Sequence, residues 1–218
     1  MKTRILLAAI MALGMMSFSF GQERTGNEMQ TIFGNSDNKI SHGGYMGISV
    51  GYTQIDGEDV MTLGGRAGWL IDHHVTVGLA GKAFVNSIYI DGYWPSNEGY
   101  NDGYYLVGGY GGFFVEPIIA PSFPVHISLP ILIGGGGLAL NESTWHDYDW
   151  DYEYYEPFDW DSYFVFEPGV EIELNVVEFF RIAFGASYRL TSNMHMQYVP
   201  KDMMNGFNAE LTLKFGKF

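Results

Sequence analysis

The segment 141–162 holds the densest collection of side chains that could bind a ligand or a metal ion. It contains eight carboxylates and eight aromatic residues but no lysine or arginine. Asp147, Asp149 and Asp151 have the alternate spacing that opens a calcium-binding loop, although the glycine and the distant bidentate glutamate of an EF-hand are absent. Carboxylate chemistry alone therefore makes these three residues candidate calcium ligands.

Acidic and aromatic residues alternate between positions 145 and 155. Because successive side chains of a strand point to opposite faces, this alternation predicts a hairpin with one acidic face and one aromatic face. Two interpretations stay open: a binding surface for glycans, partner proteins or divalent ions, and a rigid solvated hairpin with an interfacial aromatic girdle. For the first interpretation, the candidate surface-binding residues are Trp145, Trp150, Tyr152, Tyr154 and Trp160.

A histidine and a serine form the other candidate for chemistry. His126 and Ser128 are two residues apart, so they share one face of an extended strand. A serine nucleophile needs an accessible substrate and a positioned base, whereas the alternation around this pair points both side chains into the interior. We therefore predict that the chain is not an enzyme. No cofactor is expected either, because the glycine run 134–137 lacks the Lys-Ser/Thr that follows in a phosphate loop, and favours close strand packing or a bulge instead.

The elements that carry these residues show a regular pattern. Between Gly43 and Phe218, eight segments follow one another in which every second residue is apolar. This period of two predicts strands rather than helices. The predicted strands cover about 45–55, 61–71, 75–90, 104–116, 125–133, 164–176, 180–189 and 207–215. After the N-terminal region no apolar run is long enough for a spanning helix, so a membrane protein with this sequence must be a barrel. The predicted fold class is all-β: an eight-stranded antiparallel transmembrane up-and-down β-barrel.

The N-terminal region predicts secretion. Lys2 and Arg4 precede an apolar run that ends in small residues, which is typical of a signal peptide covering 1–21. Residues 22–42 are then a polar linker, and 43–218 the barrel. Without the two signal-peptide cations the chain keeps 11 − 2 = 9 basic and 25 acidic residues, so the formal charge changes from −14 to −16. This acidity argues against nucleic acid as a partner. The absence of cysteine excludes disulfides, thiolate metal sites and lipoprotein attachment.

The connections between the predicted strands alternate in length. Short turns lie near residues 72, 121 and 177, whereas long connections lie near 91–103, 141–162 and 193–205. Outer-membrane barrels have short periplasmic turns and longer external loops. We therefore expect a multi-pass barrel in the outer membrane of a Gram-negative bacterium, with both mature termini in the periplasm.

Ten charged residues fall on the predicted inward face. They are Arg66, Lys82, Arg181, Arg189 and Lys214, together with Glu116, Glu167, Glu171, Glu173 and Glu210. An eight-stranded barrel is just wide enough for its interior to be filled by side chains, and unpaired buried charge is costly. These residues are therefore expected to form a paired charge network in the lumen. A small-solute conduit is the alternative for this interior.

The signal peptide, the eight strands, the loop asymmetry and the terminal aromatic residue together resemble small outer-membrane barrels of the OmpA/OmpX-like class. More narrowly, 42–45, 65–69 and 111–137 resemble uncharacterised secreted barrel proteins of Gram-negative bacteria. This narrower resemblance implies no known activity. We expect a structural or surface-interaction role: envelope integrity, adhesion or ligand capture through the acidic-aromatic loop. The expected partners are outer-membrane lipid, the barrel assembly machinery, and an extracellular ligand or a basic surface partner.

Two features of the chain qualify this resemblance. His126 and Ser128 are similar to the His/Ser pair of barrel lipid A deacylases, so an outer-membrane lipid-modifying enzyme is the alternative function. In addition, Phe218 is out of step with the apolar residues Phe215 and Leu213, whereas the class usually has its last aromatic residue on that same face. We therefore expect a bulge near Gly216 or a weaker assembly signal.

Overall fold

The computed structural model describes residues 41–88, 103–143, 159–196 and 199–218. The signal peptide and most of the linker expected from the sequence lie outside these ranges. The strands are β1 (His42–Ile55), β2 (Glu58–Ile71), β3 (Val75–Ile88), β4 (Gly103–Ile119), β5 (Val125–Ser128), β6 (Ile131–Ser143), β7 (Asp159–Val177), β8 (Phe180–Thr191) and β9 (Gly206–Lys217). Within the described ranges, no helix is long and apolar enough to cross a membrane.

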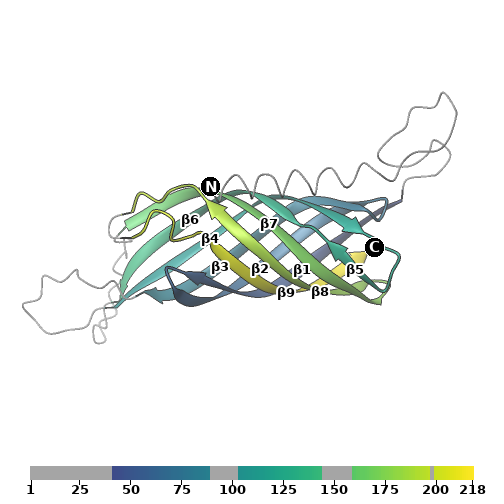
Figure 1. The fold of residues 1–218 in the computed structure, drawn as a ribbon, viewed down its shortest axis with the longest axis horizontal. Coiled ribbons are helices and arrows are strands. Elements are labelled where there is room, and N and C mark those ends of the chain that lie inside the picture. The colour runs from purple at the N-terminus through teal and green to yellow at the C-terminus, as the bar shows by residue number, and fades with distance from the viewer. Residues whose placement is uncertain (1–40, 89–102, 144–158, 197–198) are drawn as a thin grey trace, which may run out of the picture. The chain divides into compact units, whose positions relative to one another are not determined.

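The strands form one closed antiparallel sheet (Figure 1). Apart from β5 and β6, each strand pairs with its neighbour in the chain, and β1 closes the ring by pairing with β9 from Gly44↔Lys217 to Thr53↔Asn208. Both β5 and β6 lie between β4 and β7, so the nine strand segments occupy eight positions around the ring. The predicted eight-stranded up-and-down barrel is therefore confirmed.

The fifth position is divided because of a proline. Pro130 has no N–H and cannot donate to the ladder. The backbone on both sides of the break stays satisfied, since the Leu129 N–H donates to the Pro117 carbonyl at 2.9 Å and the Gly169 N–H donates to the Pro130 carbonyl at 2.7 Å. A strand of four residues, β5, and one of thirteen residues, β6, therefore occupy the place of the single strand that the sequence predicts.

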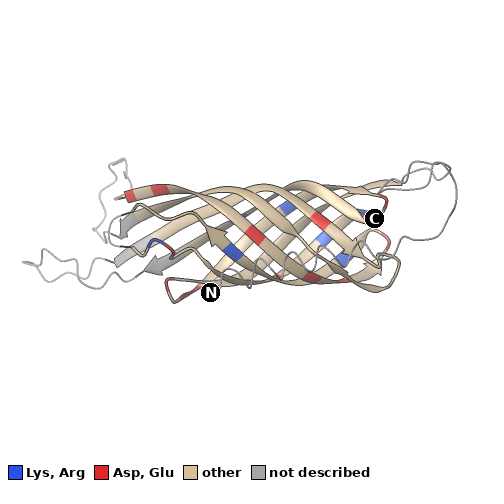
Figure 2. Cartoon of the chain, turned by 45° about the horizontal axis from the view of Figure 1, so that its top comes forward, with Lys and Arg blue, Asp and Glu red and all other residues tan. Residues whose placement is uncertain are grey.

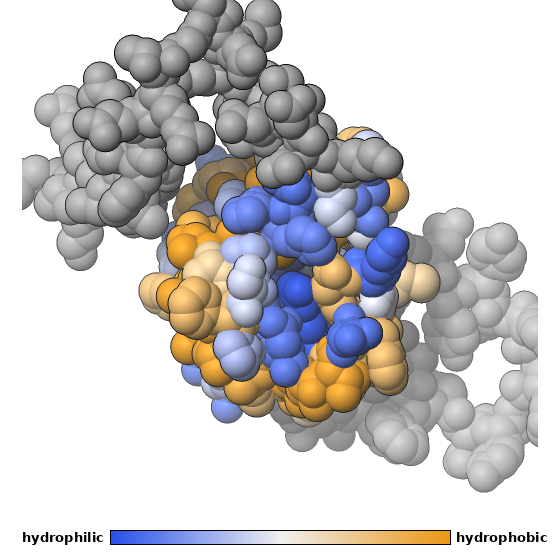
Figure 3. All heavy atoms as spheres, turned by 90° about the vertical axis from the view of Figure 1, so that its right-hand side faces the viewer, coloured by the Kyte–Doolittle hydropathy of each residue, from blue (hydrophilic) through white to orange (hydrophobic). Residues whose placement is uncertain are grey.

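Apolar side chains cover the outside of the barrel and polar ones fill much of its inside. Met46 and Phe113 are 71% and 75% exposed, and Ile172 and Phe184, which face each other across β7 and β8, are both half exposed. Looking along the barrel, hydrophilic residues lie in the centre, and hydrophobic ones border them most clearly at the left and at the bottom of the view (Figure 3). This is the inward and outward alternation that the sequence predicts.

The two ends of the barrel differ. We call one the turn end, because it carries the short connections 72–74, 120–124 and 178–179 as well as the start of β1 and the C-terminus. The other is the loop end, from which the connections 89–102, 144–158 and 192–205 depart. At the loop end β6 continues to Ser143 and β7 starts at Asp159, so the structure places both edges of the expected loop 141–162 within strands.

Close strand packing accounts for the glycine run 134–137. Gly134 lies opposite Gly112 of β4. A Cβ atom at Gly134 would overlap the carbonyl oxygen of Gly111, and one at Gly112 would overlap the carbonyl oxygen of Ile133. The run therefore lets β4 and β6 approach each other, in agreement with the interpretation of the sequence as strand packing.

The expected bulge near Gly216 is wrong. The pairing of β1 with β9 runs through Tyr45↔Gly216 and Gly44↔Lys217 without a shift, and the described irregularity in this region lies in β7 between Asn175 and Val177. Simple alternation continues to the end of the chain, so Phe218 faces inward. Its ring stacks on that of Tyr45, with 5.7 Å between centroids.

Candidate functional site

The ten charged residues singled out in the sequence all face the barrel interior. They come from β2, β3, β4, β7, β8 and β9, and each side chain is at most 10% exposed. In Figure 2 charged positions of both signs lie on the strands in the middle of the barrel and toward the end that carries the C-terminus, while other acidic positions lie on a strand at the opposite end. Six strands thus bring distant parts of the chain to one lumen.

The centre of this arrangement is the ammonium group of Lys214. Its Nζ lies 2.6 Å from Glu116 Oε1, 2.9 Å from Glu171 Oε2 and 2.6 Å from Glu173 Oε1. The Tyr45 hydroxyl also donates to Glu116. One oxygen from each of the three carboxylates lies within 4.8 Å of the others, which is a spacing that could hold a metal ion. Here the lysine supplies the cation between the three carboxylates.

A second pair of cations extends the network toward the middle of the barrel. Arg66 Nη2 lies 2.7 Å from Glu171 Oε1 and also pairs with Glu210. Lys82 Nζ lies 2.8 Å from Glu167 Oε1 and 2.7 Å from Glu210 Oε2. Since a buried ion pair is favourable only when both charges are well bonded, these shared contacts offset the cost of removing the groups from water.

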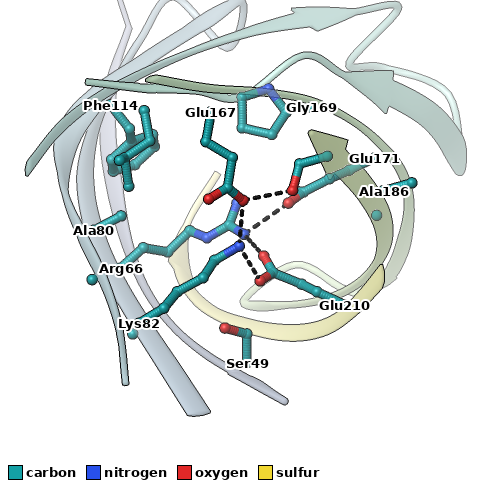
Figure 4. A pocket seen from close by; sticks show the side chains of 16 residues that line it. Ser49, Arg66, Ala80, Lys82, Phe114, Glu167, Gly169, Glu171, Ala186 and Glu210 are labelled. Atoms are coloured by element: carbon teal, nitrogen blue, oxygen red, sulfur yellow. Dashed lines mark hydrogen bonds and ion pairs between the residues drawn. The ribbon is translucent and has the colours of Figure 1, made fainter. Parts of the chain in front are cut away.

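A cavity of about 40 Å³ lies beside these groups, with Ser49, Phe114 and Gly169 also in its wall (Figure 4). A water molecule needs roughly 10–15 Å³ of such volume, so only a few waters fit. The cavity is therefore a pocket inside a filled lumen rather than a channel.

At the turn end the network is closed by aromatic and imidazole rings. Arg181 Nη1 lies 3.4 Å from Glu173 Oε2, and His126 Nε2 lies 3.1 Å from the same oxygen. The guanidinium carbon of Arg181 sits 3.9 Å from the centroid of the Phe218 ring. The inward-facing terminal residue therefore contacts the charge network as well as Tyr45.

Arg189 stands apart from the other nine charged residues. It makes no ion pair with any residue in the described part of the chain. Its Nε donates to the Met204 carbonyl at 2.5 Å, its Nη1 approaches Asn208 Oδ1 at 3.5 Å, and its guanidinium lies 5.4 Å from the Tyr110 ring. The connected network thus holds four of the five cations and all five carboxylates. Arg189 is the fifth cation, and it makes the number of positive charges in the lumen equal to the number of negative ones.

The sequence analysis missed the layer that covers the lumen at the loop end. Four methionines of the connection between β8 and β9 are buried there: Met194, Met196, Met203 and Met204. They belong to one apolar cluster with inward residues of the strands, among them Leu106, Leu140 and Tyr163. We call these four residues the methionine cap. The sequence shows these methionines as two pairs within one connection, which is a sign of an apolar contact. The alternation of the strands, however, does not predict that this connection turns inward.

The His126 and Ser128 side chains have different hydrogen-bond partners. Both residues are buried, at 3% and 0% exposure. The Ser128 hydroxyl donates to Glu116 at 3.1 Å and approaches Glu171 at 3.4 Å, while the His126 ring contacts Glu173 and the Phe123 carbonyl. The histidine is therefore not placed as a base on the serine hydroxyl, which activation of a serine nucleophile requires.

Most candidate residues of the acidic-aromatic segment lie outside the described residues. This applies to Asp147, Asp149, Asp151, Trp145, Trp150, Tyr152 and Tyr154. Trp160, in β7, is 69% exposed. On the same strand, Asp161 Oδ2 accepts the backbone N–H of His195 at 2.5 Å, which ties the connection between β8 and β9 to the edge of β7.

No protein-family model matches the chain, and no curated protein matches it by sequence. Among solved structures, Neisserial surface protein A (NspA) has 10% identity and a TM-score of 0.51, over 83% of this chain and all of that one. The attachment invasion locus protein Ail of Yersinia pestis, solved with the heparin analogue sucrose octasulfate, has 11% identity and a TM-score of 0.48, over 80% of this chain and 97% of that one. The N-terminal β-barrel domain of Pseudomonas aeruginosa OprF has 9% identity and a TM-score of 0.45, over 79% of this chain and 96% of that one.

The similarity to NspA concerns the fold alone. It agrees with the closed ring described above, and the resemblance to small eight-stranded outer-membrane barrels is thereby confirmed at the level of fold. What the chain binds must be argued from its own residues.

Proposed function

We propose that this chain is an integral outer-membrane barrel with a structural or surface-interaction role. The observation that carries the proposal is the combination of an apolar outer surface with a filled, charged lumen. Exposed aliphatic and aromatic side chains such as Met61, Leu79 and Phe184 would be unfavourable in water but match the hydrocarbon core of a bilayer. The filled lumen supports a role at the surface rather than in transport.

The proposed orientation places the turn end in the periplasm and the loop end outside. It is supported by the difference between the short and long connections, because external loops are the longer ones in this class of barrel. Protease added to intact cells should then cut within 144–158 and leave the connection 120–124 intact. Mass spectrometry of the fragments provides the measurement. Cleavage at 120–124 in intact cells would reverse the orientation.

The charge of the loop end supports a basic partner or a divalent cation as the ligand. The described carboxylates there are Asp56, Glu58, Asp59, Asp159, Asp161 and Asp202, against a single lysine, Lys201. The segment 144–158 adds five more carboxylates by sequence. Attraction between such a surface and a cationic partner speeds encounter and weakens with salt.

Calcium is the first probe for this surface. Because like charges two residues apart on a strand face repel each other, a bridging cation should order the segment and change the fluorescence of its tryptophans. We expect calcium to have a larger effect than magnesium, and both a larger effect than sodium chloride at equal ionic strength. The triple variant Asp147→Asn, Asp149→Asn, Asp151→Asn should respond equally to calcium, magnesium and sodium chloride at equal ionic strength.

A matched control removes the same amount of charge elsewhere at the loop end. The variant Asp56→Asn, Glu58→Gln, Asp202→Asn changes three exposed residues, and its calcium response should equal that of the unchanged protein. Equal responses to all salts would leave a solvated hairpin without a binding role. The same two variants, tested with a lysine-rich peptide on the protein in vesicles, would show whether a basic partner uses the same carboxylates.

A further inference from the structure

The cavity beside Arg66 and Lys82, which we call the lumen pocket, is open because small residues surround it. Its wall includes Ser49, Ala80, Gly169, Gly185 and Ser187. Their side chains are too short to fill the middle of the lumen, so about 40 Å³ stays open between the larger charged side chains. The sequence therefore creates this space by placing small residues at neighbouring positions of several strands.

Two polar atoms of the pocket wall have no hydrogen-bond partner among the residues that the structure describes. They are Nη1 of Arg66 and Oε2 of Glu167. Both side chains line the lumen pocket and are more than nine-tenths buried, with 8% of the Arg66 side chain and 3% of the Glu167 side chain exposed. In Figure 4 they reach into the pocket from different walls.

The other atoms of these two groups are well bonded. Arg66 Nη2 pairs with Glu171 and Glu210, whereas Nη1 approaches Glu116 Oε1 only at 3.6 Å, which is too long for a hydrogen bond. Glu167 Oε1 accepts from Lys82 Nζ at 2.8 Å and from Ser187 Oγ at 2.5 Å. A buried polar atom without a partner is costly, and more so when it belongs to a charged group. A ligand that fits here accepts from Arg66 and donates to Glu167.

We propose that the lumen pocket is a water-binding site, in which roughly one to three water molecules join Arg66 Nη1 to Glu167 Oε2. Water both accepts and donates hydrogen bonds, so one kind of ligand satisfies both atoms. The size selects the same ligand, because a water molecule needs roughly 10–15 Å³ of such volume and a larger solute does not fit into about 40 Å³. The wall holds charges of both signs, which disfavours an ion of either sign.

The proposed water connects two parts of the ion-pair network. Arg66 pairs with Glu171, and Glu167 pairs with Lys82, so a bridge between Arg66 and Glu167 adds a second connection beside their common partner Glu210. This inference concerns the inside of the barrel and goes beyond the proposed surface role. The pocket can be dry while the loop end binds a ligand, and the reverse, so the two proposals fail independently.

The Tyr110 hydroxyl is the competing partner for Glu167. Tyr110 lies opposite Lys82 in the register of β3 and β4, so both side chains point into the lumen, and its hydroxyl is also buried without a hydrogen-bond partner among the described residues. However, Tyr110 does not line the lumen pocket. A direct bond from Tyr110 to Glu167 would leave Arg66 Nη1 unsatisfied, whereas water in the pocket can reach both groups.

A high-resolution crystal structure of the mature protein provides the direct test. We expect electron density for at least one water molecule in the pocket, within hydrogen-bond distance of Arg66 Nη1 and of Glu167 Oε2 directly or through a second water. An empty pocket would overturn the proposal. So would side chains that close the pocket, with Tyr110 bonded to Glu167.

Variants of Ala80 provide a second test in solution. Ala80→Val adds two methyl groups to the wall and should displace water, which leaves the two polar atoms without a partner. We expect the equilibrium constant for folding, measured in lipid vesicles, to fall by about tenfold or more. Ala80→Ser adds a hydroxyl that a hydrated pocket accommodates, so this variant should be clearly more stable than Ala80→Val. In a dry pocket the order reverses, because the methyl groups fill a void and the hydroxyl is buried without a partner.

Ala83 provides the matched control on the same strand. It is exposed on the outer face of β3, where valine should be at least as stable as serine because this face meets lipid. Opposite orders at Ala80 and Ala83 are the result that we expect. The same order at both positions, with serine the less stable, would contradict a hydrated pocket. If Ala80→Val does not fold, the crystal structure of the unchanged protein and the stability of Ala80→Ser still decide.

Discussion

Lys214 is the residue on which the lumen depends most. Its ammonium contacts three buried glutamates at 2.6–2.9 Å. The variant Lys214→Met leaves these carboxylates without their shared cation, and removal of one member of a buried pair typically costs about 3–5 kcal/mol. We expect a loss of this size in the free energy of unfolding, measured by denaturant titration in lipid vesicles.

Lys217, three residues further along the same strand, is the matched control for this prediction. It is exposed, so the variant Lys217→Met should change the free energy of unfolding by less than about 0.5 kcal/mol, as surface substitutions usually do. Equal effects of the two variants would mean that the ion pairs around Lys214 do not contribute to stability.

At the scale of single residues, the sequence indicated which charges face inward but not how they pair. Alternation assigns the face of Glu173 or Arg189 directly, because the side-chain period of a strand is two. Pairing depends on which strands lie opposite each other across the lumen and on how far each side chain reaches. This is why Arg189 could not be separated from the other cations in advance, although it bonds to the Met204 carbonyl instead of a carboxylate.

At the scale of strands, the assignment of inside and outside can be tested on β7 and β8. Ile172 and Phe184 are directly paired across these strands and both face outward. The variants Ile172→Arg and Phe184→Arg should each destabilise the barrel by about 2–4 kcal/mol, which is the cost of an arginine at the bilayer midplane. Unfolding in vesicles of defined lipid gives the measurement.

Tryptophan scanning checks the same assignment without charge. Brominated acyl chains should quench the fluorescence of the variants Ile172→Trp and Phe184→Trp, and should leave that of Ser187→Trp, on the inner face of β8, nearly unchanged. Quenching of the inner position but not of the outer ones would show that the faces are reversed. The variants are compared in a background without the native tryptophans.

Strand positions were predictable because the apolar alternation is long and regular, and the exceptions have local causes. Pro130 divides one strand because it has no N–H. The proline is visible in the sequence, but its effect on the hydrogen-bond ladder is not. The connection 193–205 was expected to be an external loop, because it is one of the long connections and these face outward in this class of barrel. Its inward packing depends on contacts with residues far away in the chain, such as Leu140 and Tyr163, which no local pattern encodes.

At the scale of the whole molecule, the lumen is obstructed in three successive layers. The methionine cap covers the loop end, the ion-pair network fills the middle, and Phe218 packs against Arg181 and Tyr45 at the turn end. The cavity within the network measures only about 40 Å³. Each layer alone would hinder an ion, because crossing the cap requires dehydration and crossing the network requires breaking paired charges.

We therefore expect the protein reconstituted in planar bilayers to show no steady conductance of porin size. A porin added to the same bilayers controls for the detection of single openings, and dye entrapped in vesicles gives an independent measurement of leakage. Removing one layer, as in Phe218→Ala, should still give no stable channel because the cap and the network remain. A long-lived open state in the unchanged protein would contradict the filled lumen, and with it the argument that this barrel acts through its outer and loop-end surfaces and not as a conduit.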